Sequence, residues 1–196
     1  MIEFTLTYEG PLPTSKTSAV KAKQAIRRKF HTQIATYWKI GPLSATHNEI
    51  KHGITFWDCF KKSHLAVKSG FTFIPVAPQA LKLACGLDIV FLRPKGTQEG
   101  DPLITHGGDI DNRLKVLFDA LRMPHKSDEI PRGDKPQADE QPYFYCLLED
   151  DAQITKISVR TDWLLKPNSD PSAVQLVIGV SLRATAMTDL NFVFGV

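Results

Sequence analysis

The stretch Val174-Gln-Leu-Val-Ile-Gly-Val-Ser-Leu182 places an apolar side chain at every second position. A period of two is typical of a β-strand that buries one face. Residues 87–92 are rich in β-branched and aromatic side chains, and Arg93-Pro94-Lys95-Gly96 follows them, which predicts a second strand. Further strands are predicted over residues 4–8, 71–74, 143–148 and 153–161, and the prolines at 75 and 78 are expected to prevent strand pairing after residue 74.

Two segments between the predicted strands have helical periodicity. The first, over about residues 18–40, spaces its large apolar side chains four apart (Ile26, Phe30, Ile34 and Trp38). The second, over residues 111–122, places leucine and phenylalanine at i, i+3, i+4 and i+7. Residues 123–142 carry four prolines and many charges, which indicates a long surface loop. The sequence therefore predicts one α/β (α+β) domain over residues 1–196, with a small mixed sheet packed by helices.

Composition excludes several classes of protein. The chain has 196 residues, of which 42% are hydrophobic and 23% charged, as in ordinary soluble globular proteins. Its three cysteines are widely spaced and form no C-x-x-C motif, which disfavours a disulfide framework or a structural zinc site and favours a reducing, cytoplasmic location. The N-terminus is acidic and alternating, and no window approaches ~18 apolar residues, so secretion and membrane insertion are not expected.

Charge is distributed unevenly along the chain. Residues 1–100 hold 14 Lys and Arg against 6 Asp and Glu, whereas residues 101–196 hold 10 against 15. The basic half could supply a phosphate-binding surface, and the acidic half could hold cations, although both charge sets could equally keep the surface solvated. Within the first predicted helix, Arg27, Arg28 and Lys29 are candidates for DNA binding, and a solvated helix face is the alternative.

Two acidic groups lie at the ends of predicted elements. They are Asp109-Ile110-Asp111-Asn112 at the start of the second helix and Glu149-Asp150-Asp151 between two strands. Carboxylates two apart in an extended segment point to the same side, so Asp109 and Asp111 could share Mg²⁺. The structural alternatives are that Asp111 caps the helix, that Lys115 pairs with Asp111 and Asp119, and that the second group forms a polar hairpin turn.

The order of these motifs resembles a known family. Asp109-Ile110-Asp111-Asn112, Lys115, Asp119-Ala120-Leu121 and Asp150-Asp151-Ala152-Gln153-Ile154 are similar to the signature of the RusA family of Holliday junction resolvases, over about residues 86–162. The resemblance implies a RusA-like fold and a homodimeric, Mg²⁺-dependent endonuclease that makes paired nicks in branched DNA, the four-way junction.

The resemblance also implies residue roles. Asp109, Asp111 and Asp151 match the family's essential acidic positions, Lys115 matches its essential lysine, and Asp150 matches a neighbour that could also contact the metal. The aspartates would hold Mg²⁺, which would activate a water to attack phosphorus, and Lys115 would stabilise the developing charge or orient that water. Where family members often carry basic residues before the first aspartate, this chain has Thr105-His106-Gly107-Gly108. Junction contacts are therefore expected elsewhere, on the helix that carries Arg27 and Arg28.

Two other functions remain open from the sequence. One is a DNA-binding protein with a regulatory or inactive metal site, in which the basic half carries the function. The other is a metal-dependent phosphohydrolase of small molecules, which would need a deep pocket. His106 and His125, which flank the second helix, could ligate a metal or move a proton, but are more commonly surface residues.

Overall fold

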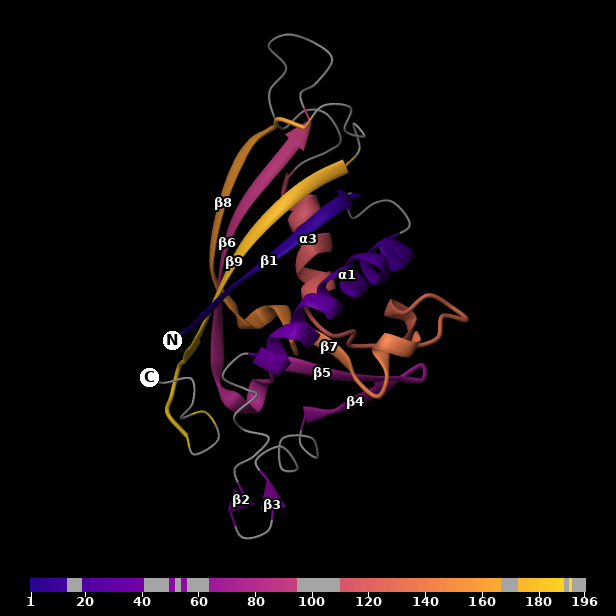
Figure 1. Ribbon diagram of the computed structural model, residues 1–196, viewed down its shortest axis with the longest axis vertical. Coiled ribbons are helices and arrows are strands. Elements are labelled where there is room, and N and C mark those ends of the chain that lie inside the picture. Colours follow the sequence, from indigo (N-terminus) through magenta and orange to yellow (C-terminus); the bar gives the residue numbers. More distant parts are fainter. Residues whose placement is uncertain are drawn as a thin grey trace.

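The computed structural model describes residues 1–13, 19–40, 50–51, 54–55, 64–94, 110–166, 173–188 and 191. Among the sequence predictions, those for Asp109 and His106 lie outside the described residues. A curved four-stranded sheet forms one side of the molecule, two helices lie against it, and a smaller sheet lies beneath the helices (Figure 1).

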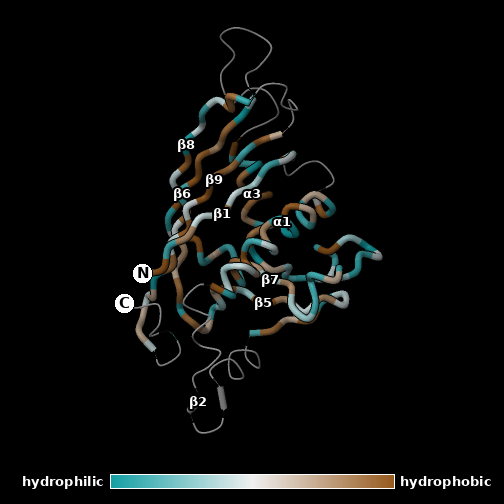
Figure 2. The backbone as a smooth tube through the Cα atoms, viewed as in Figure 1, coloured by the Kyte–Doolittle hydropathy of each residue, from teal (hydrophilic) through white to brown (hydrophobic). Residues whose placement is uncertain are grey.

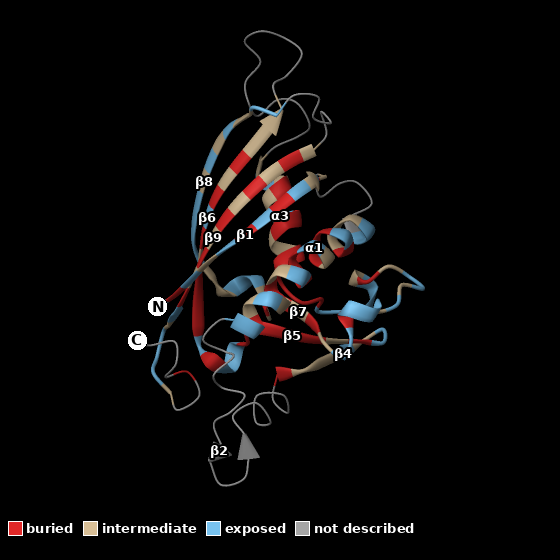
Figure 3. Cartoon of the chain, in the orientation of Figure 1, coloured by how far each residue is buried: buried red, intermediate tan, exposed pale blue. Residues whose placement is uncertain are grey.

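The four-stranded sheet has the order β1-β9-β6-β8. Its strands are β1 (Ile2–Pro11), β9 (Ala173–Ala184), β6 (Leu83–Pro94) and β8 (Ile154–Leu164). Strand β9 runs antiparallel to both β1 and β6, whereas β8 runs parallel to β6. The alternation predicted for residues 174–182 is confirmed, because every second residue of β9 from Val174 to Leu182 is buried (Figure 3).

The smaller sheet contains β4 (Ala66–Lys68), β5 (Phe71–Ala77) and β7 (Phe144–Leu148), with β5 and β7 parallel. The expectation that pairing stops before Pro75 is wrong, since Pro75 is in register with Cys146 of β7. Strand β4 pairs only with residues 71–73. Residue 75 therefore has a strand on one side only, and a proline without an N–H is tolerated there. The short strands β2 (Ile50–Lys51) and β3 (Ile54–Thr55) pair with each other.

Helices α1 (Ala19–Ile40) and α3 (Ile110–Leu121) contribute apolar faces to one core with the sheets. Both match the predicted helices to within a residue or two at each end. The buried side chains of α1 are spaced as predicted, and those of α3 include Val116, Leu117 and Leu121. Strands β6 and β9 are rich in hydrophobic residues (Figure 2), and burial alternates along residues 87–92 of β6 and 174–182 of β9, whose face toward the helices is the buried one. The core thus holds α3 in a fixed position between the two sheets.

The segment 123–142 is mostly exposed, as predicted, but it is pinned to the fold. Met123 and Ile130 pack with Phe71, Phe73 and Phe144 in a second apolar cluster. Arg28 of α1 donates to Glu140 Oε1 (2.7 Å) and to Asp134 Oδ1 (3.0 Å). The segment therefore acts as a cover for the outer face of the smaller sheet.

The architecture agrees with the predicted class at the level of an α+β fold with mixed sheets packed by helices. Within the described residues, neither α-helix has an apolar stretch long enough to cross a bilayer.

Candidate functional site

The first turn of α3 carries Asp111, and Lys115 follows one turn later on the same side. Both side chains are exposed. Because α3 begins at Ile110, Asp111 lies inside the helix and the prediction that it is the N-cap is wrong. Its charge is still favourably placed, since the N-terminal end of a helix carries a partial positive charge.

The predicted ion pairs of Lys115 are absent among the described residues. Asp119 instead binds Lys23 of α1, with 2.5 Å between Nζ and Oδ2, and Arg122, with 2.9 Å between Nη2 and Oδ1. The partner from α1 was not predictable from helical spacing, because it comes from a helix that packs across α3. The carboxylate of Asp119 is thus paired with cations inside the fold, whereas Asp111 and Lys115 face solvent.

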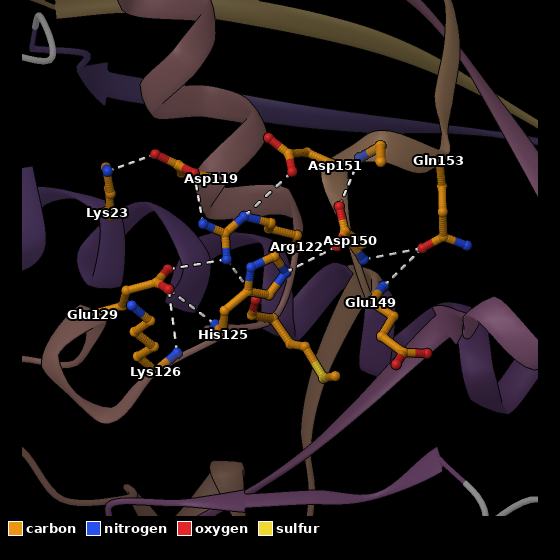
Figure 4. A network of polar contacts seen from close by, with 12 residues as sticks. Lys23, Asp119, Arg122, His125, Lys126, Glu129, Glu149, Asp150, Asp151 and Gln153 are labelled. Atoms are coloured by element: carbon orange, nitrogen blue, oxygen red, sulfur yellow. Dashed lines mark hydrogen bonds and ion pairs between the residues drawn. The ribbon is translucent and has the colours of Figure 1, made fainter.

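Arg122 is the centre of a polar network just beyond the last residue of α3 (Figure 4). Besides Asp119, its guanidinium contacts Glu129 (Nη1 to Oε2, 3.0 Å) and faces Asp151 (Nε to Oδ1, 3.7 Å). The last distance is too long for a hydrogen bond, so Asp151 is attracted by Arg122 but not fixed by it. The Arg122 side chain is only 10% exposed, whereas that of Asp151 is 46% exposed.

The second acidic group follows the end of β7, where the short turn η5 (Asp151–Gln153) begins. The predicted hairpin turn is wrong, since β7 and β8 belong to different sheets. Backbone bonds connect three element ends here: Met123 N–H donates to Leu148 O (2.9 Å), and Glu149 N–H donates to Ala77 O (3.2 Å). The carboxylates of Asp150 and Asp151 are therefore presented from a well-braced corner.

Asp150 and Asp119 are both stabilised as anions. The N–H of Ala152, which donates to Asp150 Oδ1 (2.8 Å), lowers the pKa of Asp150, and attraction from His125, whose Nε2 lies 3.3 Å from Oδ2, adds to the effect. For Asp119, burial raises the pKa, but the contacts with Lys23 and then Arg122 outweigh burial and the net pKa is lowered. Both carboxylates carry charge that the surrounding chain already compensates.

The two acidic groups lie toward opposite ends of α3. A helix rises ~1.5 Å per residue, so about 16 Å of helix axis separates Asp111 from Arg122, which Asp151 faces. Within the described residues no three His, Cys, Asp or Glu side chains gather closely enough to hold a metal. Asp111 and Asp151 are exposed carboxylates, and such oxygen donors are the ligands that Mg²⁺ prefers. The donor chemistry at each position fits a hard cation, but the structure does not bring Asp111 and Asp151 close enough to ligate one ion.

The structure assigns the three candidate DNA-binding residues different roles. Arg27 is 1% exposed and donates to Gln24 Oε1 (2.7 Å), Asp119 O (2.8 Å) and Arg122 O (3.2 Å), so its predicted role as a DNA contact conflicts with its burial. Arg28 is partly buried and pins the 123–142 segment. Lys29 is exposed, and its Nζ donates to Glu9 O (2.5 Å).

Sequence reasoning missed Arg122 and Lys23, which compensate the acidic residues at the C-terminal end of α3. One signal was present for Arg122, which lies three residues after Asp119 and therefore on a neighbouring position of the helix surface. For Lys23 no local signal exists. His125 was considered as a metal ligand, and the structure places its ring against Asp150.

No protein-family model matches this chain, and comparison with curated proteins finds no significant relative.

Proposed function

We propose that the chain is a Mg²⁺-dependent endodeoxyribonuclease that nicks four-way DNA junctions. One observation supports it above others: Asp111 and Lys115 are exposed on one face of α3 and make no ion pair with described residues, while the neighbouring Asp119 is fully paired. An exposed carboxylate that no cation of the chain compensates is available to bind Mg²⁺.

In this proposal Asp109 and Asp111 hold the metal at the start of α3, whereas Asp151 and its neighbour Asp150 lie too far along the helix axis to ligate the same ion. Bound Mg²⁺ would activate a water nucleophile and stabilise charge on the phosphate oxygens. Lys115, one turn from Asp111, stabilises the negative charge that develops on the phosphate in the transition state. Lys29 contributes to the junction-binding surface. A two-fold dimer would present two such sites to the two symmetric strands of a junction.

A DNA-binding protein without catalysis is the second candidate function. It is favoured by the ion pairs of Arg122 with Asp119 and Asp151 and by the contact of His125 with Asp150. These contacts stabilise the acidic side chains without a bound metal ion. A small-molecule phosphohydrolase has less support. Three surface hollows of the described residues lie over the open face of the large sheet, between β1 and α1, and beside residues 127–134, and none is lined by Asp111, Lys115 or Asp151.

Cleavage of a synthetic four-way junction tests the proposal. The wild-type chain should nick the junction in Mg²⁺ but not in a chelator, and unlabelled junction should compete far better than linear duplex of the same length. Asp111→Asn should lower the single-turnover rate at least ~10³-fold, because it removes a metal-binding charge. The exposed Asp128 gives a matched control, and Asp128→Asn should cleave at the wild-type rate.

Binding of the junction without cleavage would favour the second candidate. A wild-type rate in Asp111→Asn would contradict the assignment of this residue to the metal site.

A further inference from the structure

We infer that the outer edge of β8 pairs with the β8 edge of a second copy of the chain, antiparallel and centred on Val159. The two edges of the large sheet differ in how their backbone groups are satisfied. At the β1 edge, Gln33 of α1 accepts from Thr7 N–H (2.9 Å) and donates to Thr7 O (2.7 Å), and Lys29 donates to Glu9 O. Helix α1 therefore covers that edge.

The β8 edge has no such cover among the described residues. Strand β8 is last in the order of its sheet and extends for 11 residues, without proline or glycine. None of its residues is buried (Figure 3), and six of the eleven are exposed. A long, regular and uncovered edge is a template for a further strand, and soluble proteins rarely leave one unprotected. Something of compatible geometry is expected to pair with it.

The side chains of β8 indicate that this partner is another β8. The face toward the helices carries Ile157, which is 49% exposed, together with Val159 and Trp163, which are partly exposed. The open face carries Lys156, Ser158, Arg160 and Asp162 at alternate positions. A two-fold axis normal to the sheet relates each face of β8 to the same face of its copy, so residues directly opposite each other come from the same face. The allowed registers therefore differ from one another in steps of two residues.

One register both aligns β8 with its copy over the whole strand and places opposite charges face to face. Centring on Val159 overlaps the whole of β8 with its copy, and it places Lys156 opposite Asp162 of the second copy, twice by symmetry. It also places Ser158 opposite Arg160. Centring on Ser158 would instead place Lys156 opposite Arg160, and centring on Arg160 would place two arginines face to face. Like charges directly opposite destabilise a strand pair, which disfavours both of these registers. Centring on Thr161 would place Arg160 opposite Asp162 but would overlap only residues 158–164, so charge and length together select the register centred on Val159.

On the other face, the same register brings Val159 against Val159 and Ile157 against Thr161, which are β-branched pairs suited to a sheet. Asp162 is already oriented at this edge, since its Oδ1 accepts from Trp163 N–H (2.8 Å). The resulting dimer joins two four-stranded sheets into one continuous sheet with all helices on one side. This inference rests on the β8 edge alone and does not depend on the proposed nuclease activity.

A charge-swap experiment tests the pairing and its register. Molar mass as a function of concentration should show a dimer for the wild-type chain. Lys156→Asp and Asp162→Lys should each raise the dimer dissociation constant at least about tenfold, because each creates two like-charge contacts per dimer. The double variant should restore the wild-type constant. Lys156→Asp should unfold at the wild-type temperature when monomeric, since Lys156 is exposed, whereas the two variants that carry Asp162→Lys should unfold slightly lower, because they lose the hydrogen bond from Trp163 N–H.

Cysteine cross-linking tests the centre directly. In a Cys59→Ser background, Val159→Cys should form a disulfide-linked dimer on mild oxidation, because opposite Cβ atoms lie ~5 Å apart. Ile157→Cys is the matched control, since its two copies would lie about 13 Å apart along the strand. Native Cys85 and Cys146 are buried. A wild-type monomer at every concentration, a dimer indifferent to the charge swap, or preferential cross-linking at position 157 would each overturn the inference.

Discussion

The two ends of α3 carry similar residues in different surroundings. At the N-terminal end, Asp111 and Lys115 are exposed and pair with no described residue. At the C-terminal end, Asp119 is held by Lys23 and Arg122, and Arg122 also contacts Glu129 and faces Asp151. Charged residues thus serve stability where the chain compensates them, and are available for binding where it does not. Motif spacing alone does not separate the two.

Removal of Arg122 should disrupt the C-terminal end most strongly. Its guanidinium is largely buried among three carboxylates. Its loss would leave Glu129 and Asp151 without this cation, while Asp119 would keep only Lys23. We expect Arg122→Ala to lower the free energy of unfolding by about 3 kcal/mol. Denaturant unfolding measures it, with the exposed Arg132→Ala as control. A loss no greater than that of the control would mean that the network contributes no stability.

Arg27 supports the same end through the backbone. It donates to the carbonyls of Asp119 and Arg122, which lie where a helix leaves its last C=O groups without internal partners. We expect Arg27→Ala to cost about 2 kcal/mol of unfolding free energy, through unsatisfied carbonyls and a cavity. Arg27→Lys should recover only part of it, because lysine lacks the planar set of donors. If Arg27→Ala unfolds like the wild type but binds junction DNA weakly, the residue belongs to a DNA surface after all.

Acid should weaken the C-terminal end through Asp119. Its pKa is lowered in the folded chain, so its contribution is complete above the unfolded value of ~3.9 and is lost as pH falls through the folded pKa. We expect Asp119→Asn to cost about 1 kcal/mol or less at neutral pH, after solvent screening. The variant should also flatten the decline of stability below pH ~4. Thermal unfolding from pH 7 to pH 2 measures this, and Asp128→Asn should keep the wild-type slope.

Periodic segments were predictable from sequence, and specific partners were not. The alternation in β9 and the four-residue spacing in α1 arise because each element buries one face, and the spacing of the apolar residues indicates that face directly. Arg27 shows how a partial signal was overlooked. It lies three residues before Phe30 and seven before Ile34, on the buried stripe of α1, so its helical position already argued against a DNA contact.

Other features had no local signal. The pairing of Asp119 with Lys23 depends on how α1 crosses α3, and the acceptance of Pro75 in β5 depends on how far β4 extends. For the candidate site, the sequence correctly singled out the ends of elements. It offered Lys115 as the cation beside Asp119, and did not indicate that Lys23 and Arg122 would pair with Asp119 while Asp111 was left exposed.

A matched pair of lysines tests the difference between the two ends of α3 most directly. Lys115 pairs with no described residue, whereas Lys23 binds Asp119. In single-turnover junction cleavage measured beside thermal unfolding, Lys115→Ala should slow cleavage at least ~10²-fold and leave stability unchanged. Lys23→Ala should lose ~0.5–1 kcal/mol of stability and cleave within a few-fold of wild type. Wild-type cleavage by Lys115→Ala, or a loss of cleavage confined to Lys23→Ala, would contradict the account.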